Sequence, residues 1–255
     1  MSERGYIPPK DDSERMLVRR IGEMAQAVAA RGGVRQTAFL SDREQALAYA
    51  ALAPLRFESY VLDGGYPEAE RRILCLYQDV PPQAPLTETL FIETPHAERP
   101  LTHRDYLGAL LSLGIKRECL GDILPCPNGA YVFALPRIAP LLLEDLTSVG
   151  RCAARVRTAS AEALPPIPQP EEKTASVASL RLDAVLAAML HVSRAEATRL
   201  IQGGAVEVNH VPMASAHSEV YENDRFSVRG YGKYRLCGTG ARSRKGRTFV
   251  SYLEY

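Results

Sequence analysis

Apolar residues over 11–31 recur at every third or fourth position, a spacing that predicts an amphipathic helix, and a glycine pair follows it. A second helix is predicted from Ser41, because this serine and the glutamate three residues later have the spacing of a capping box. The apolar residues 60–62 stand before an Asp-Gly-Gly turn and favour a strand. Apolar residues return between 68 and 78. The pattern indicates a small mixed helix-and-strand domain over 1–79.

A proline-rich break at 81–85 separates this region from one in which predicted strands and helices alternate. The expected strands are 89–93, 121–124, 130–135 and 153–158, and the expected helices are 102–114 and 138–146. This β-α-β-β-α-β order is that of the ferredoxin-like fold. Many RNA-binding modules share that fold, but it also hosts other functions. We therefore expect a ferredoxin-like central domain over 80–178.

Prolines are frequent over 162–178, and we interpret this stretch as a semi-rigid connector. A helix is predicted after it, because apolar residues follow at helical spacing, and Ser193 begins a further capping box for a second helix. Asn209-His210 marks a hairpin turn, and 225–229 alternates as a strand does. The last domain is expected over 179–255. The fold class is thus multi-domain α+β.

The composition is that of a globular chain, with 46% apolar residues in a length of 255 that suits two or three domains. No apolar run reaches the roughly 18 residues that a membrane span needs. The start of the chain is polar and partly acidic, unlike a secretory signal. The five cysteines are scattered without a Cys-x-x-Cys pair, as expected of free thiols in a reducing cytoplasm. We expect a cytoplasmic protein without a membrane partner.

Charge is distributed unevenly along the chain, although the net charge is only +1. Residues 180–255 contain 11 basic and 7 acidic residues, whereas 1–179 contain 20 basic and 23 acidic residues. Between Arg225 and Arg247 there are eight basic residues and no acidic one. Such uncompensated positive charge favours a polyanionic partner, most often nucleic acid.

The segment Ser179–His210, SLRLDAVLAAMLHVSRAEATRLIQGGAVEVNH, closely resembles the S4 RNA-binding domain, and the likeness extends to about residue 236. Two turns depart from the family pattern. Asn209-His210 stands where the family usually has Asn-Gly, and Asn223-Asp224 where it often has Gly-Asp. Asparagine tolerates a positive φ, so the second change is mild.

The segments FLSDREQALAYA, GGYPEAERRILCLYQD, LTHRDYLGALLSLGIKRECLGDIL and VGRCAARV resemble YlmH-type proteins, so the likeness covers nearly the whole chain. The resemblance implies a small N-terminal domain, a ferredoxin-like central domain and a C-terminal S4 domain. It also implies a ribosome-associated protein that binds rRNA or tRNA. Family members are implicated in rescue of stalled large ribosomal subunits, with an older association with cell division.

Given this resemblance, Arg181 and Arg194 are the first candidates for RNA contact, because each stands at a helix start and a guanidinium bonds two phosphate oxygens at once. Helix N-termini add N–H groups and a positive dipole end. The alternative is that both are solvated surface arginines. Asp183 is expected to cap the first helix or to orient an arginine, and Ser193 to cap the second helix, with a phosphate contact possible beside that role.

The remaining candidates lie on the second helix, the hairpin, the basic tail and the central domain. In the tail, glycines and the aromatics Tyr231 and Tyr234 stand between the cations, which favours close approach to RNA over a merely solvated face. Next to the expected end of the central helix, cations could bind phosphate or simply complement the helix dipole. These candidates are Ala197, Asn209, Arg229, Lys233, Arg235, Lys116 and Arg117.

The sequence gives no sign of catalysis. No His has a Cys or carboxylate at metal-ligand spacing, and no phosphate-binding loop or cofactor motif is present. Thr102-His103-Arg104-Asp105 is better interpreted as a helix cap than as a catalytic group. We expect a non-enzymatic RNA-binding protein without cofactor or small-molecule substrate. Two alternatives stay open: an RNA-modifying enzyme of the pseudouridine synthase or methyltransferase type, and an adaptor in cell division.

Overall fold

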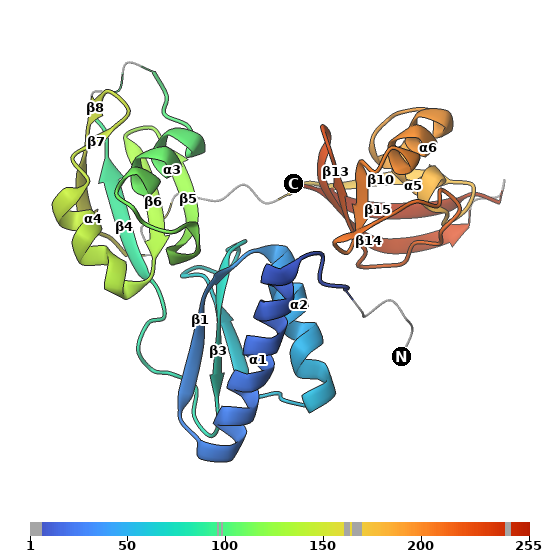
Figure 1. The fold of residues 1–255 in the computed structure, drawn as a ribbon. Helices are drawn as coiled ribbons and strands as arrows, with labels where there is room; N and C mark the ends of the chain where they lie inside the picture. Colours follow the sequence, from blue (N-terminus) through green and yellow to red (C-terminus); the bar gives the residue numbers. More distant parts are fainter. Residues whose placement is uncertain (1–6, 96, 98, 161–163, 165–169, 243–245) are drawn as a thin grey trace. The chain divides into compact units, whose positions relative to one another are not determined.

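The computed structural model describes residues 7–95, 97, 99–160, 164, 170–242 and 246–255 of the chain. Two compact units are present, Met1–Ile167 and Pro168–Tyr255 (Figure 1). The expected class, a multi-domain α+β protein with a C-terminal S4 domain, is confirmed by the fold. Each unit is described by itself below.

The first part of unit 1 is a three-stranded antiparallel sheet, in the order β1-β3-β2, with two helices against it. Ile21 and Val28 of the first helix pack with Leu74 and Leu76 of the central strand. The sequence did not predict the edge strand β1. The elements are α1 (Asp12–Arg31), β1 (Val34–Leu40), α2 (Asp42–Leu52), β2 (Tyr60–Asp63) and β3 (Arg72–Tyr77).

The helix starts in this part follow their capping residues. Asp11 accepts a hydrogen bond from the N–H of Glu14 through its side chain, at 2.9 Å. Ser41 and Glu44 form the reciprocal capping box that their spacing predicts. Gly32 ends α1 with a φ of 71°, a conformation that glycine adopts at little cost.

The second part of unit 1 confirms the expected ferredoxin-like order. Its antiparallel sheet runs β5-β6-β4-β9, so the first and third strands of the motif are central. Thr102 and Asp105 form a capping box at the start of α3, as expected. The elements are β4 (Glu88–Glu93), α3 (His103–Ser112), β5 (Leu120–Cys126), β6 (Gly129–Ala134), α4 (Ala139–Asp145), the hairpin β7 (Ser148–Val149) and β8 (Cys152–Ala153), and β9 (Arg155–Thr158).

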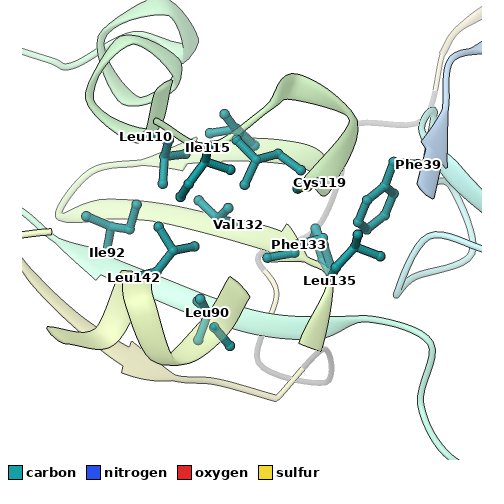
Figure 2. Close-up of a cluster of buried hydrophobic side chains, with 14 of the residues drawn as sticks. Phe39, Leu90, Ile92, Leu110, Ile115, Cys119, Val132, Phe133, Leu135 and Leu142 are labelled. Carbon is teal, nitrogen blue, oxygen red and sulfur yellow. The ribbon is translucent and has the colours of Figure 1, made fainter. Parts of the chain in front are cut away.

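The two parts of unit 1 share one hydrophobic core. Phe39 of β1 is buried and points towards Cys119, Phe133 and Leu135 of the second part (Figure 2). The carboxylate of Asp122 accepts three hydrogen bonds from the first part, from Tyr66 Oη at 2.8 Å and from two backbone N–H groups at 2.6 and 3.1 Å. The boundary that the sequence predicts at residue 79 is therefore not a gap in the packing.

Unit 2 is a six-stranded antiparallel sheet in the order β10-β15-β14-β13-β11-β12, with two helices over one face (Figure 1). Leucine, valine and aromatic side chains of both layers make its core. The elements are β10 (Glu172–Val177), α5 (Leu182–Met189), α6 (Arg194–Gln202), β11 (Val206–Val208), β12 (Val211–Pro212), β13 (Arg225–Val228), β14 (Gly232–Arg242) and β15 (Thr248–Glu254).

The structure differs from the expected connector over 162–178. Residues 172–177 form β10, which pairs with β15 over six residue pairs and so belongs to the sheet of unit 2. The prolines Pro165, Pro166 and Pro168 lie outside the described residues, as do the first six residues of the chain. The basic segment 225–247 spans β13 and β14 and reaches the start of β15, although Arg244 and Lys245 lie outside the described residues.

Candidate nucleic-acid interface

Two arginines meet at one buried carboxylate in unit 2. Asp183 lies in the first turn of α5, and its side chain is only 5% exposed. Arg181, just before that helix, donates to Asp183 from Nε at 3.2 Å and from Nη2 at 3.1 Å. Arg194, the first residue of α6, donates to Asp183 Oδ2 from Nη2 at 2.6 Å. The starts of both helices are thereby held together by an ion cluster, here called the arginine clamp (Arg181, Asp183 and Arg194).

The clamp keeps its carboxylate charged and leaves guanidinium donors for a partner. Burial raises the pKa of Asp183, but the hydrogen bonds from Arg194 and Arg181 outweigh it, so the pKa lies below its ordinary value. The side chains of Arg181 and Arg194 stay 37% and 53% exposed. A guanidinium has five N–H donors in a rigid fork, and Asp183 uses only some of them. Two oriented, partly exposed guanidinium groups suit phosphate oxygens.

His217 joins this cluster, which sequence reasoning did not foresee. Its Nδ1 lies against Arg181 Nη2. Because a guanidinium can only donate, Nδ1 is the acceptor in this contact. His217 is exposed and lies 36 residues from Arg181 in the sequence, so no local pattern could have paired them.

The starts of α5 and α6 offer fewer backbone N–H groups for phosphate binding than the sequence led us to expect. The N–H groups of Leu182 and Asp183 donate to the carbonyls of Ser218 and Ala216, at 2.8 and 3.1 Å, so these two amides at the start of α5 already have acceptors. Ser193 caps α6, since its Oγ accepts from the N–H of Glu196 at 3.1 Å. At this site the guanidinium groups, rather than these two backbone amides, are the partly exposed donors.

Two predicted contact residues have structural roles. Ala197 is fully buried in the core of unit 2, so its side chain is not available to RNA. Asn209 has a φ of 49° in its turn, and its amide bonds Asp224 Oδ1 at 2.7 Å and the N–H of Arg225 at 2.9 Å. The Asn209 amide thus ties the turn between β11 and β12 to the start of β13. Asn223 has a φ of 70°, as expected from the tolerance of asparagine for this conformation.

Two of the three predicted cations of the basic tail lie on one face of the sheet. Lys233 and Arg235 alternate with the buried Tyr234 along β14, so they point to the face opposite α5 and α6. Arg235 donates from Nη2 to Asn223 Oδ1 at 2.7 Å. Arg229 is exposed just after β13. Of the two expected aromatics, Tyr231 is exposed but Tyr234 is buried, so Tyr234 supports the core instead.

The candidate phosphate site of the central domain is only half exposed. Lys116 is exposed. Arg117 is partly buried and donates from Nη1 to the carbonyls of Leu120 and Gly121, at 2.6 and 3.0 Å. Burial, followed by the neighbouring charge of Arg71, lowers the pKa of Arg117 to about 10. Arg117 therefore binds the protein backbone, contrary to the expectation of a cation open to phosphate.

The described part of the chain contains no cluster of three His, Cys, Asp or Glu side chains that could hold a metal ion, while His96 lies outside it. No helix among the described residues is long and apolar enough to cross a membrane.

Three segments of the chain match family models. Residues 13–79 match the N-terminal domain of YlmH, 87–163 a putative RNA-binding domain in YlmH, and 180–226 the S4 domain. The arginine clamp lies inside the segment that matches the S4 domain. The strands β10, β14 and β15 lie outside it.

Individual proteins show the same relationship. The ribosome-associated protein quality control protein P2 of Bacillus subtilis (strain 168) is 28% identical over 243 residues, which cover 94% of each chain. The structure of the cell division protein ylmH from Streptococcus pneumoniae superposes with a TM-score of 0.52 at 17% identity, covering 63% of this chain and 99% of that chain. At this identity the second likeness shows the fold alone.

Proposed function

Because the chain belongs to the YlmH family of S4-domain proteins, we propose that it is a non-enzymatic factor that binds structured RNA on the large ribosomal subunit. The RNA is rRNA, tRNA or both, and the setting is the rescue of stalled translation in the cytoplasm. The name of the Bacillus subtilis relative supports the association with the ribosome and with quality control.

The observation that carries the proposal is the arginine clamp. Asp183 holds Arg181 and Arg194 side by side at the surface. Because the two side chains are already held in place, they lose less conformational entropy when they bind a phosphate. Structured RNA presents phosphates and 2′-hydroxyls rather than base edges, and such groups are bound by charge and shape. Guanidinium groups held in this way bind and position RNA through its phosphates.

Co-sedimentation with purified large subunits tests the proposal. The full chain is expected to pellet, and Arg194→Gln to pellet about tenfold more weakly, because one charge-assisted contact contributes roughly 1.5 to 3 kcal/mol. Arg199→Gln is the matched control, since Arg199 lies on the same helix, is exposed and pairs with Glu196. It points about 140° away from Arg194 around the helix. Equal pelleting of the parent and Arg194→Gln would contradict the assignment of this surface.

The salt dependence of binding tests its electrostatic basis. If about five phosphates are engaged, a plot of the logarithm of affinity against the logarithm of salt concentration should have a slope of about −3 to −5. A slope near zero would exclude the clamp and the basic tail as the source of affinity.

Mass spectrometry tests the proposal that the protein does not modify the RNA that it binds. RNA incubated with the protein, with and without S-adenosylmethionine, is expected to keep its mass, which excludes methylation. Pseudouridine has the same mass as uridine, so carbodiimide labelling of the same RNA, which is expected to detect none, tests the pseudouridine synthase alternative. A reproducible mass change would instead favour an RNA-modifying enzyme.

A further inference from the structure

Among the described residues of unit 2, helices cover one face of the sheet, and no helix lies over the other, here called the open face. Phe226, Val228, Tyr234 and Leu236 of β13 and β14 are buried in the same core as α5 and α6. Successive side chains of a strand point to opposite faces. The open face is therefore made by the alternate residues, namely Glu172, Thr174 and Ser176 of β10, Glu207 of β11, Arg225 and Ser227 of β13, Lys233 and Arg235 of β14, and Phe249, Ser251 and Leu253 of β15.

Cations lie in the middle of this open face. In the register of β13 and β14, Arg225 is directly opposite Arg235, and Ser227 is opposite Lys233. Arg225 and Arg235 therefore place two positive charges next to each other on this face. The acidic residues of the face, Glu207 and Glu172, are on strands to either side. Positive charge is thus concentrated along the central strands.

An exposed aromatic ring lies on the same face. Phe249 of β15 is 49% exposed. The neighbouring strand has glycine at 238 and 240, and a Cβ atom on Gly240 would lie 3.5 Å from the Cβ of Phe249. A larger residue there would cover the ring, so the glycine keeps it open. Glycine inside a strand often marks such a place of close approach.

A further cation completes this end of the face. Arg247 donates from Nε to Ser176 Oγ at 3.0 Å, and Ser176 is the register partner of Phe249. Phe249 lies four residues from Leu253, which is opposite Arg235. Four residues of strand span about 13 Å. The face therefore presents a flat ring with a cation beside it and a second group of cations about 13 Å away.

We propose that this open face is a second RNA surface, which binds an unpaired strand next to the structured RNA held by the arginine clamp. The inference deepens the proposed function and depends on it. Unpaired bases expose their flat faces and stack on aromatic rings, while cations follow the phosphates of the same strand. Bases inside a duplex are already stacked on one another, so Phe249 has no comparable use against paired RNA. The strands that carry this ring and most of these cations lie outside the segment that matches the S4 domain.

Fluorescence anisotropy with a labelled unstructured RNA of about ten nucleotides tests the ring directly. Phe249→Ala is expected to weaken binding about fivefold or more, because stacking on an aromatic side chain contributes roughly 1 to 3 kcal/mol per base. This variant changes no charge, so unspecific attraction would leave its affinity equal to that of the parent. A loss of less than about twofold, or no binding by the parent, overturns the proposal.

A double variant tests the cations, and the full chain is used throughout. Arg225→Gln/Arg235→Gln should weaken binding of the same RNA about tenfold or more. Arg19→Gln/Arg20→Gln is its control, since it removes two exposed arginines from α1 and gives the same net charge. Equal losses in both double variants overturn the proposal. Thermal unfolding of each variant shows whether its fold is kept.

Photocrosslinking locates the bound strand without any substitution. Cleavage after Arg247 releases the peptide Thr248–Tyr255, which contains Phe249 and no further Lys or Arg. A nucleotide adduct on this peptide supports the proposal, and adducts confined to other peptides overturn it. Pelleting with large subunits stays a separate readout, so loss of single-strand binding alone is distinguishable from failure of the proposed function.

Discussion

At the scale of single residues, Asp183 is the carboxylate on which the candidate interface depends. Its negative charge repels a phosphate, yet its hydrogen bonds hold both guanidinium groups of the clamp in place. Of the two roles that the sequence left open for it, the structure shows the orientation of arginine. Under the proposed function, a negative residue supports the binding of a negative partner.

Asp183→Asn is therefore expected to weaken RNA binding about fivefold or more, because an amide keeps the shape but removes the charge that orders the two arginines. Glu196→Gln is the control, since it removes a carboxylate that pairs with Arg199 outside the clamp. Affinity for large subunits measures both variants. If Asp183→Asn binds more tightly than the parent, its charge opposes RNA more than its hydrogen bonds help.

Glu14 gives unit 1 a pH dependence whose sign can be worked out. The hydrogen bond from Arg43 lowers the pKa of this buried carboxyl from 4.5 to about 2, against the opposing effect of burial. A lowered pKa stabilises the fold fully above pH 4.5, and this stabilisation is lost as the pH falls towards about 2.

Glu14→Gln should thus lower the free energy of unfolding by about 2 to 3 kcal/mol at neutral pH and reduce the acid sensitivity of unit 1. Denaturant unfolding at neutral pH and near pH 2 measures the difference, which should shrink in acid. Glu23→Gln, on the same helix but in an exposed pair with Arg19, should cost under about 0.5 kcal/mol. Equal effects of the two substitutions would refute this account.

At the scale of secondary-structure elements, β10 decides where unit 2 begins. It forms one edge of the sheet and pairs with β15, while its Val177 is buried in the core. Its loss would leave the backbone of β15 without a partner on that side and expose apolar surface.

We predict that residues 179–255 alone unfold at a lower temperature than residues 170–255, by about 5 °C or more if the strand contributes about 1 kcal/mol. Circular dichroism of the two fragments measures the difference. Identical melting temperatures would support the domain boundary that the sequence predicted at residue 179.

The elements that the sequence predicted have strong local signals, and those that it missed do not. The helices at Ser41 and Thr102 have capping boxes, and the central domain has an alternation of element types that indicates its topology. In contrast, β1 begins with exposed residues and has an irregular register, and β10 is polar apart from its last residues. Strands of this kind form because a neighbour pairs with them, which a local pattern does not contain.

The candidate site shows the same limit. The sequence identified Arg181 and Arg194 as separate candidates, but their meeting at one carboxylate depends on how α5 and α6 pack. Arg117 shows the reverse case. Its neighbourhood in the sequence favours an exposed cation, whereas the fold directs its guanidinium to backbone carbonyls. A sequence shows which residues are charged, but the tertiary structure determines the group with which each of them pairs.

At the scale of the whole molecule, Asp122 joins the two parts of unit 1. Asp122→Asn is expected to destabilise unit 1 by about 2 to 3 kcal/mol, because it weakens three hydrogen bonds to a charged acceptor at once. Tyr66→Phe removes only one of them and should cost about 1 kcal/mol. Hydrogen exchange of the amides of Glu70 and Arg71 reports the joint directly. Unchanged exchange in Asp122→Asn would show that contacts other than those of Asp122 hold the two parts together.

The shared core around Phe39 also constrains how such a chain can be recombined in evolution. An exchange of residues 13–79 between distant relatives would place a foreign side chain against Phe133 and foreign donors against Asp122. Hybrid proteins joined near residue 80 take the two sides of this contact from different parents and should therefore misfold. Hybrids joined near residue 168 keep each compact unit intact and should fold. We therefore expect the two parts of unit 1 to be inherited together, with the residues that meet between them changing together.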